Sequence, residues 1–370
     1  MLTLLISPDS TEPHGLSRGE CYVFEDHNAA EYLLHGWGRL VEEGAHQPAG
    51  QWHASYPARR GNLVIIRSGG FGDLICLRPL LQHLWRHRAG EPIERLAVCC
   101  HPAHAAALDG LEGIEYLPYP PSATDLEPFY WRLSLEGVIE TNTEQDSIAA
   151  FARKALANQS TTGLDWAPTY TVPPAAVEAA WQRFPRVLPQ RIGIALHSSA
   201  HCRNWPLERL AELIHGIGTG CEVFLFGKPG PWPEIDVGAD VPHLHLLPRL
   251  TGPSNEQGLT LRESLALLAT MDVFIGPDSG LVHAAGAMSI PTVALFGPFE
   301  AWQRVARYAS VRVLQGRAPC SPCHHHPRTP SQTWPEGKPC QAMQHCVAMA
   351  GITGEQVLDE VRRLIPSLPA

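Results

Sequence analysis

The sequence predicts an α/β fold with two tandem halves, each a parallel sheet with helices on its faces, and a small α+β module in front of them. One repeated pattern supports this prediction. Short continuous apolar runs are followed by glycine or other small residues and then by a helical stripe of apolar residues, as in buried parallel strands and their crossover helices. A second observation is the length: 370 residues suit two to three domains of roughly 150 residues each.

The composition indicates packed cores and argues against a nucleic-acid-binding surface. Hydrophobic residues make up 44% of the chain and charged residues 18%, a balance unlike that of disordered chains. Lys and Arg total 28 against 37 Asp and Glu, which gives a net charge of −9. Broad binding to nucleic acid needs a cationic surface, so the charge argues against this class of partner and leaves room only for a local anion pocket.

No segment has the length and hydropathy of a membrane span. The N-terminal apolar run, residues 1–6, is far shorter than the ~20 residues that a spanning helix needs, and it lacks the basic start of a secretion signal. We therefore expect a cytoplasmic protein, free or peripheral at the inner face of the membrane. Its 10 cysteines are expected to be reduced unless they bind metal.

Residues 1–46 are predicted to form a small separate module. Its expected elements are strands at 2–6, 21–24 and 38–43 and a helix at 27–34. Residues 47–60 are polar and rich in His, Pro and Gly, as in a linker. No side chain of this module points to a reaction, so we expect it to serve packing or homo-oligomerisation.

The first α/β half is expected over residues 61–188. Its first strand is the apolar run 63–66, followed by a glycine loop and a helical stripe over 74–87. Its further elements are expected as strands at 96–100, 116–117 and 137–140 and a helical segment at 104–108. Residues 161–190 are rich in Pro, Thr and Ala and are typical of an interdomain connection.

The second half is expected over residues 189–350, with a Cys-rich loop at 318–347 and a last helix within 351–370. Its expected strands lie at 191–197, 221–226, 273–275 and 292–296. Its expected helices lie at 206–216, 261–269, 281–288 and 354–364. Ligands of open α/β folds bind at the carboxyl ends of the strands, so the residues that follow these strands are the candidates for chemistry.

The loop at residues 68–73 follows the first strand of the first half and contains Gly70 and Gly72. Glycines there let backbone N–H groups face an anion at the start of a helix. The spacing does not match a dinucleotide-binding loop, and the next strand ends without a carboxylate, which argues against NAD. The residues leave two interpretations of Asp73 open: a helix cap, or a functional carboxylate at the ligand-binding sheet edge.

The strand at 191–197 is followed by Ser198, Ser199 and Arg203. The two hydroxyls can donate to phosphate oxygens, and the planar guanidinium can bind a phosphate with two hydrogen bonds. A solvated arginine on an ordinary loop is the alternative.

The strand at 273–275 leads to Asp278, Ser279, Gly280 and His283 at the start of a helix. Small residues at a helix N-terminus suit a pyrophosphate, and a carboxylate can accept hydrogen bonds from sugar hydroxyls. The alternatives are a capping role for Asp278 and a buried core position for His283.

These segments together resemble glycosyltransferase family 9, the ADP-heptose:lipopolysaccharide heptosyltransferases. The resemblance covers residues 62–365 and is carried by Gly70, Gly72, Asp73, Pro79 and Leu80, by residues 203–206, and by residues 278–285 with 291–298. It implies the GT-B fold, in which two facing Rossmann-like domains hold the active site between them. It also implies inverting transfer of a sugar from a nucleotide-diphosphate donor without a catalytic metal.

The resemblance assigns roles by position. Asp73 matches the general base and Asp278 a sugar-binding carboxylate, and the matches to donor-phosphate contacts are Arg203 (commonly Lys in the family), Ser279, Gly280 and His283. From their chemistry and position we also expect Ser198 and Ser199 to contact the donor phosphates, and Gly70 and Gly72 to belong to the acceptor-side loop. The implied donor is ADP-heptose, and the implied acceptor is a glycan, a lipid-linked molecule or a protein. The loop at 227–232 lacks the carboxylate that helps to hold the nucleoside in the lipopolysaccharide enzymes.

Two other functions fit the same sequence. One is a non-catalytic nucleotide-sugar-binding or scaffold protein, against which the presence of Asp73 argues. The other is a GT-B-like sugar-nucleotide epimerase, which needs no acceptor.

Four cysteines lie close together near the end of the chain: Cys320, Cys323, Cys340 and Cys346. A C-x2-C pair followed by two more thiols suits a tetrahedral structural site for Zn or Fe. The cluster is similar to that of autotransporter heptosyltransferases, which carry an iron-binding finger, although the spacing differs. Reduced thiols or disulfides are the alternative. A metal bound here is expected to order the loop and to take no part in catalysis.

Overall fold

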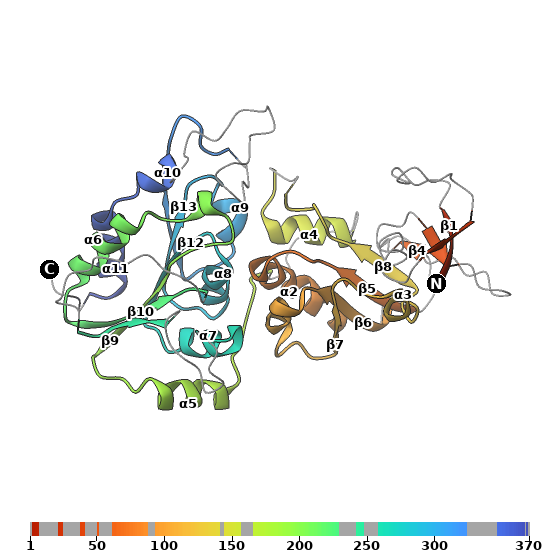
Figure 1. Ribbon diagram of the computed structural model, residues 1–370, viewed down its shortest axis with the longest axis horizontal. Coiled ribbons are helices and arrows are strands. Elements are labelled where there is room, and N and C mark those ends of the chain that lie inside the picture. The colour runs from red at the N-terminus through yellow and green to blue at the C-terminus, as the bar shows by residue number, and fades with distance from the viewer. Residues whose placement is uncertain are drawn as a thin grey trace. The chain divides into compact units, whose positions relative to one another are not determined.

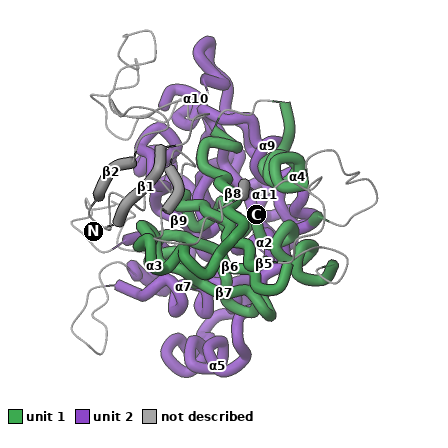
Figure 2. The backbone as a smooth tube through the Cα atoms, turned by 90° about the vertical axis from the view of Figure 1, so that its right-hand side faces the viewer, with its two compact units in different colours: residues 1–166 green, residues 167–370 purple. Residues whose placement is uncertain are grey.

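The computed structural model describes residues 61–87, 93–140, 144–156, 166–228, 242–247, 258–323, 346–366 and 368, together with the backbone of four strands within residues 1–60. The chain divides into two compact units, residues 1–166 and 167–370, which Figure 2 draws in different colours. Each unit contains its own parallel sheet.

The N-terminal strands form a small antiparallel sheet in the order β2-β1-β3. They span Leu2–Ile6 (β1), Cys21–Phe24 (β2) and Gly38–Leu40 (β3). The predicted strands of this module are therefore present, and residues 41–43 of the last one lie outside the described residues. The predicted helix at 27–34 lies outside the described residues. Gly50–Gln51 (β4), within the expected linker, pairs in parallel with a strand of the larger sheet.

The larger sheet of unit 1 has five parallel strands in the order β4-β8-β5-β6-β7. Its remaining strands are β5 (Gly61–Ile66), β6 (Ile93–Cys100), β7 (Ile114–Pro118) and β8 (Trp131–Ser134). The chain adds β6 and β7 on one side of β5 and then returns to place β8 on the other side (Figure 1). The strand order thus reverses between β5 and β8, which is where ligands of such folds bind.

Helices cover this sheet and confirm the strand–loop–helix pattern of the first half. They are α2 (Phe71–Arg86), the 3-10 helix η1 (Pro102–Leu108), α3 (Ala123–Leu126) and α4 (Ser147–Leu156). Most of α2 is buried and it contacts both α4 and η1. The predicted strand at 137–140 is wrong: these residues form a turn, and Gly137 has a φ of 71°, a left-handed conformation that breaks an extended chain. The fourth strand is β8, a few residues earlier.

The sheet of unit 2 has six parallel strands in the order β11-β10-β9-β12-β13-β14. They are β9 (Gln190–Ala195), β10 (Cys221–Phe226), β11 (Leu244–Leu246), β12 (Val273–Pro277), β13 (Thr292–Phe296) and β14 (Val311–Gln315). This is the strand order of dinucleotide-binding α/β domains, and it reverses between β9 and β12. The sequence did not indicate β11 or β14.

The central strands of unit 2 are buried on both faces, as their continuous apolar runs predict. One face carries aliphatic side chains that pack with helices α6 (Leu207–Ile217), α10 (Val347–Ala350) and α11 (Gly354–Leu364). The other face carries four buried phenylalanines: Phe224, Phe226, Phe274 and Phe296. Gly193 in β9 lies among them, and a Cβ there would come within 2.8 Å of the Phe274 ring.

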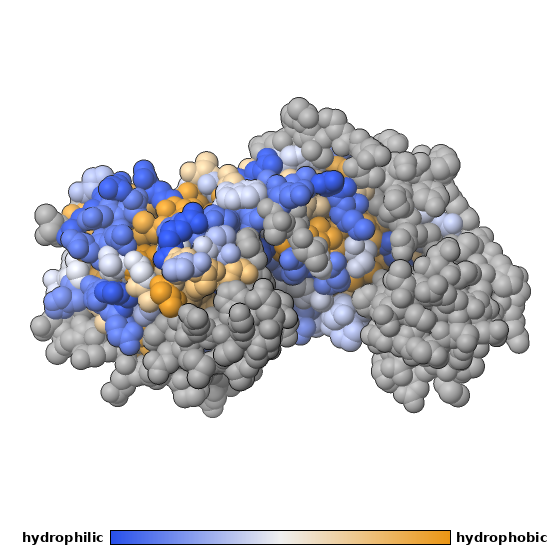
Figure 3. All heavy atoms as spheres, turned by 90° about the horizontal axis from the view of Figure 1, so that it is seen from above, coloured by the Kyte–Doolittle hydropathy of each residue, from blue (hydrophilic) through white to orange (hydrophobic). Residues whose placement is uncertain are grey.

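The remaining helices of unit 2 are α5 (Pro174–Arg183), η2 (His201–Arg203), α7 (Leu261–Leu268), α8 (Gly280–Ala287) and α9 (Trp302–Val305). The segment expected as a connection, 161–190, therefore contains a helix, α5, which packs on α7. Within the described part of the chain, no helix is both long and apolar enough to cross a bilayer. Polar residues dominate the described surface in Figure 3, with apolar areas between them.

Candidate functional site

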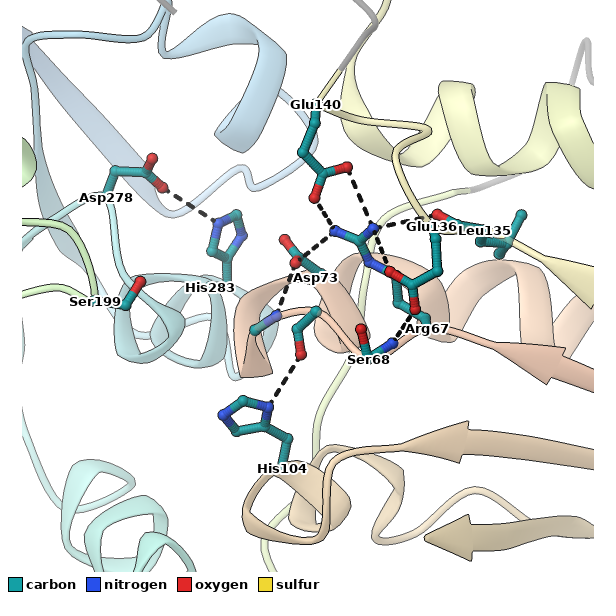
Figure 4. Close-up of polar contacts among 12 residues, drawn as sticks. Arg67, Ser68, Asp73, His104, Leu135, Glu136, Glu140, Ser199, Asp278 and His283 are labelled. Atoms are coloured by element: carbon teal, nitrogen blue, oxygen red, sulfur yellow. Dashed lines mark hydrogen bonds and ion pairs between the residues drawn. The ribbon is translucent and has the colours of Figure 1, made fainter. Parts of the chain in front are cut away.

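A fully buried arginine follows the carboxyl end of β5. Arg67 donates from Nη2 to Asp73 Oδ2 at 2.8 Å and to Glu140 Oε1 at 2.6 Å (Figure 4). Its Nη1 lies 3.6 Å from Glu136 Oε2 and donates to the Leu135 carbonyl at 3.2 Å. Burial opposes the charge of this guanidinium, but the carboxylates of Asp73 and Glu140 raise its pKa above the ordinary value. Arg67 is therefore a permanent cation that gathers three carboxylates.

Asp73, the predicted base, is the third residue of α2. Its Oδ2 also accepts a hydrogen bond from the Gly70 backbone N–H at 2.9 Å, so it satisfies one of the free donors at the helix start. The N-cap residue is thus Gly70, while the Asp73 carboxylate caps the helix start from its third position and pairs with Arg67; the functional interpretation of Asp73 stays a prediction. The side chain remains 25% exposed, which leaves it accessible to a second molecule.

The glycine that the geometry requires in this loop is Gly69. A Cβ there would meet Asp73 Oδ2 and would come within 2.6 Å of Arg67 Nε, so any side chain would displace the ion pair. By contrast, a Cβ on Gly70 has nothing closer than Asp73 Oδ2 at 3.8 Å.

The backbone of the same loop is held by two further contacts. The Gly69 carbonyl lies 3.0 Å from His104 Nδ1, and the Ser68 N–H donates to the Glu136 carboxylate. The roles predicted for Gly70 and Gly72 stay predictions.

Sequence reasoning missed Arg67, Glu136 and Glu140. The arginine directly follows the apolar run of β5, a position that was available as a signal. The two glutamates follow β8, and the misplaced strand at 137–140 concealed them. Since β5 and β8 are neighbours at the reversal point of the sheet, these residues meet although they are far apart in the chain.

In unit 2, the residues after β9 form a compact polar loop. The Arg203 guanidinium donates to Ser199 Oγ at 2.7 Å, and the Asn204 side-chain oxygen accepts from the Ser198 N–H at 2.8 Å. Ser198 Oγ is turned inward and bonds both the N–H and the carbonyl of Ala200. Ser199, which is exposed, is therefore better placed than Ser198 to meet a ligand.

Asp278 follows β12 and is 4% exposed. Its Oδ2 accepts a hydrogen bond from Arg203 Nη1 at 3.1 Å. Its Oδ1 lies 3.8 Å from His283 Nε2 (Figure 4). Burial opposes ionisation of Asp278, but Arg203 and, to a smaller extent, His283 and Arg304 lower its pKa well below the ordinary value. The carboxylate is therefore charged and accepts hydrogen bonds only.

The start of α8 presents unsatisfied donors beside this pair. Ser279 is the N-cap residue, yet its side chain makes no capping hydrogen bond. Its Oγ is buried and has no hydrogen-bond partner among the described residues. Arg203 Nε is likewise buried and without a hydrogen-bond partner among them. Gly280 opens the helix, whose N-terminus carries a partial positive charge. Buried donors without partners at a helix N-terminus suit a bound anion.

Of the predicted donor-site residues, unit 2 therefore brings together Ser199, Arg203, Asp278 and His283, next to the start of α8. Two residues that the sequence did not indicate belong with them. Arg304 acts electrostatically on Asp278, and Tyr308 lies against His283. Both follow β13, the neighbour of β12.

The cysteines give a different result. Cys320 is exposed, Cys323 half-buried and Cys346 buried, whereas Cys340 lies outside the described residues. Across the part of the chain that the structure describes, no three His, Cys, Asp or Glu side chains form a group that could hold a metal ion. The four-cysteine site stays a prediction. In unit 1, burial raises the pKa of the Cys99 thiol to about 12, as expected of an unreactive core cysteine.

Comparisons with known proteins give one family match and solved structures with a similar fold. Residues 152–332 match the family model of glycosyltransferase family 9 (heptosyltransferase), whereas no curated protein matches the sequence. The solved structure of E. coli ADP-heptose LPS heptosyltransferase II is similar, with a TM-score of 0.58 and 16% identity over 82% of this chain and 98% of that chain.

The iron-containing dodecameric glycosyltransferase TibC from enterotoxigenic E. coli is also similar, with a TM-score of 0.56 and 19% identity over 90% of this chain and 83% of that chain. A structure of TibC in complex with ADP-D-β-D-heptose gives a TM-score of 0.54 and 18% identity, with coverage of 90% and 83%. These likenesses confirm the predicted α/β fold with two parallel sheets, that of GT-B heptosyltransferases. Together with the family match, this fold indicates a glycosyltransferase.

Proposed function

We propose that the protein transfers a sugar, with inversion, from a nucleotide-diphosphate donor to an acceptor hydroxyl. The observation that carries the proposal is the cluster at the carboxyl edge of the unit 2 sheet. There the buried Asp278 pairs with the partly buried Arg203 beside the start of α8, where the Ser279 hydroxyl has no partner among the described side chains and backbone groups. A diphosphate needs cations and N–H or O–H donors, and this cluster supplies both.

The donor contacts follow from the chemistry of each group. Arg203, Ser199, Ser279 and the N-terminus of α8 at Gly280 bind the diphosphate, with His283 nearby and Ser198 shaping the loop. Asp278, an acceptor only, receives hydrogen bonds from sugar hydroxyls. As the bond between the anomeric carbon and the diphosphate breaks, negative charge grows on the leaving phosphate, and the guanidinium and the helix N-terminus stabilise it.

Asp73 acts as the general base. The acceptor oxygen forms the new bond to the anomeric carbon while its proton passes to the Asp73 carboxylate, and the nucleoside diphosphate leaves with the electron pair of the broken bond. Arg67 and the Gly70 N–H hold the carboxylate through its Oδ2. No step uses a metal ion. The acceptor class, a homo-oligomer and a cytoplasmic location stay predictions.

ADP-heptose is the donor that the comparisons support best. The matching family model is described as heptosyltransferase, and TibC has been solved with ADP-D-β-D-heptose. Titration calorimetry and thermal unfolding with ADP, UDP, GDP and ADP-heptose test this choice. A bound donor at about 100 times its Kd should stabilise the protein by about 2.7 kcal/mol. Stabilisation by UDP or GDP and none by ADP would reject the adenine assignment while keeping the reaction class.

Replacement of Asp73 by Asn tests the base. Turnover should fall by about 10²- to 10⁴-fold because the proton acceptor is lost, whereas donor binding should persist. The matched control is Asp125→Asn. Asp125 is likewise the third residue of a helix in unit 1 and accepts from the Ser122 N–H at 2.9 Å, so this variant loses a similar cap. Equal turnover in wild type and Asp73→Asn would remove Asp73 from the mechanism.

Two other outcomes identify the alternative functions. Donor binding without transfer to any acceptor tested would indicate a non-catalytic binding protein. Conversion of the donor sugar in the absence of an acceptor would indicate an epimerase.

A further inference from the structure

A buried tyrosine contacts the histidine of the unit 2 cluster. Tyr308 follows α9 and is 5% exposed, as is His283. Its hydroxyl lies 3.1 Å from His283 Nδ1, and the two rings are 5.7 Å apart at 66° (centroid distance and interplanar angle). The Tyr308 backbone is fixed as well, because its N–H donates to the Val305 carbonyl at 3.1 Å.

The helix that carries His283 is shaped to receive this ring. Gly286 lies nearly one turn after His283 on α8, and a Cβ there would come within 2.7 Å of Tyr308 Cγ and 2.8 Å of Cδ1. The tyrosine ring therefore packs directly against the helix backbone. Because Gly286 has no side chain, the Tyr308 ring lies close enough to α8 for its hydroxyl to reach His283.

Electrostatics decides which group donates in the Tyr308–His283 hydrogen bond. His283 Nε2 faces the Asp278 carboxylate at 3.8 Å, and this carboxylate is charged because it pairs with Arg203. A lone pair on Nε2 would be repelled by that charge, whereas an N–H is attracted, so Nε2 carries the proton. In the neutral ring Nδ1 is then an acceptor, and the tyrosine hydroxyl donates to it.

We infer that Tyr308 is a positioning residue: its hydroxyl holds His283 in the Nε2–H form, with this N–H directed toward Asp278 and the donor sugar diphosphate. The link to the donor rests on the proposed function. Three charged groups act at this end of the cluster, namely Asp278, Arg203 and Arg304. A fixed N–H beside the Asp278 carboxylate keeps the charge pattern that the donor meets constant.

Tyr308→Phe keeps the ring and removes the hydroxyl. Loss of one buried hydrogen bond should raise the Kd for ADP and the KM for the donor by about fivefold, with a smaller change in kcat. The tautomer itself is measured in the free protein. A long-range ¹H–¹⁵N spectrum with ¹⁵N-labelled histidine distinguishes protonated from unprotonated ring nitrogens, and the His283→Gln spectrum assigns the signals. Wild type should show the Nε2–H form, and Tyr308→Phe a mixture of tautomers.

Two further variants separate this role from general packing. Gly286→Ala keeps the hydroxyl but displaces the ring, so it should shift the tautomer in the same direction as Tyr308→Phe. Tyr170→Phe removes the hydroxyl of another tyrosine of unit 2 that is 5% exposed, and should leave the His283 signals unchanged. Thermal unfolding of each variant verifies that it is folded.

The results divide cleanly. A wild-type Nδ1–H form, or a tautomer that Tyr308→Phe does not change, overturns the inference. A changed tautomer with unchanged ADP affinity overturns the positioning role in donor binding. If wild type binds no nucleoside diphosphate, the proposed function fails and the donor role of Tyr308 fails with it, while the spectra still decide whether Tyr308 sets the tautomer.

Discussion

Each unit contains a fully buried arginine at one end of a central strand of its sheet. The surroundings of the two arginines differ. Arg67 follows the carboxyl end of β5 and holds Asp73, Glu136 and Glu140, whose side chains are 25%, 29% and 44% exposed. Arg191 stands at the amino end of β9 and pairs with Glu222, which is 1% exposed. One cation gathers carboxylates that solvent can reach, and the other is enclosed with its partner.

The difference follows from which end of the sheet each arginine occupies. Ligands of parallel α/β folds bind at the carboxyl ends of the strands, so charged groups there must stay accessible. At the amino end the Arg191 guanidinium instead donates to the Phe184 carbonyl at 2.6 Å and to Thr270 Oγ1 at 3.3 Å, and it stacks 4.4 Å from the Trp181 ring. We interpret the Arg67 cluster as functional and the Arg191 pair as structural.

Breaking the enclosed pair should give the largest effect. Glu222→Gln leaves the Arg191 charge buried without a counterion and should lower the free energy of unfolding by about 3–5 kcal/mol, measured by urea denaturation. Turnover of the folded fraction should stay at the wild-type level, since this pair lies at the sheet end away from the strand ends that carry the site.

The double variant Arg191→Met/Glu222→Leu sharpens this test. Exchange of a whole buried ion pair for apolar side chains of similar volume is often neutral, so the double variant should be more stable than Glu222→Gln. If Glu222→Gln and the double variant were equally unstable, the neutralisation of the Arg191 charge by Glu222 would not be what stabilises the protein. The stabilisation would then come from the other hydrogen bonds of Arg191 and Glu222.

Removing Arg67 from its solvent-accessible cluster with Asp73, Glu136 and Glu140 (the open cluster) should have a smaller effect on stability and a clear effect on turnover. In Arg67→Met the three carboxylates can still be hydrated, so the loss of stability should be about 1–3 kcal/mol. Asp73 loses its fixed position, and turnover should fall by about 10- to 100-fold.

Arg95→Met is the matched control for Arg67→Met. Arg95 forms two hydrogen bonds with Glu115, at 2.8 and 2.7 Å, but the pair is exposed and should contribute less than about 1 kcal/mol. Its loss should leave turnover unchanged. Wild-type turnover in Arg67→Met would show that the open cluster is as structural as the enclosed one.

Much of the fold could be predicted from local patterns. The apolar run at β5, its loop and the stripe of α2 were all evident, because each pattern lies within one stretch of chain. The apolar Val138 and Ile139 suggested a strand that the left-handed Gly137 prevents. Helix α5 was concealed because Ala180 is its one buried residue, which leaves no apolar stripe to detect.

The site could be predicted only as a set of separate strand ends. Residue type after a strand made Asp73, Arg203 and Asp278 candidates for the site. Their partners depend on which strands are neighbours, and local sequence does not contain that information. Arg67 and Glu140 are 73 residues apart, and Arg203 and Asp278 are 75 apart. Each pair meets because the strand order reverses at that point of its sheet.

The smallest predicted effect is a pH dependence within the enclosed cluster. The His245 ring stacks 4.3 Å from Phe224, and its Nε2 lies 3.8 Å from Glu222 Oε1. Burial lowers the pKa of His245, Glu222 opposes this, and Arg191 and His243 lower the pKa further. The unfolded chain, with a histidine pKa of about 6.5, therefore binds the proton first as the pH falls, so stability is present above that value and is lost below it.

Urea denaturation at pH 7.5 and 5.5 (~1 unit either side of that value) measures this effect. Between the two pH values, wild type should lose more unfolding free energy than His245→Phe. If wild type and His245→Phe lost the same unfolding free energy at low pH, the Glu222 carboxylate would compensate the charge of a protonated His245. The enclosed cluster of Arg191, Glu222 and His245 would then tolerate a change of charge as well as the Arg67 cluster does.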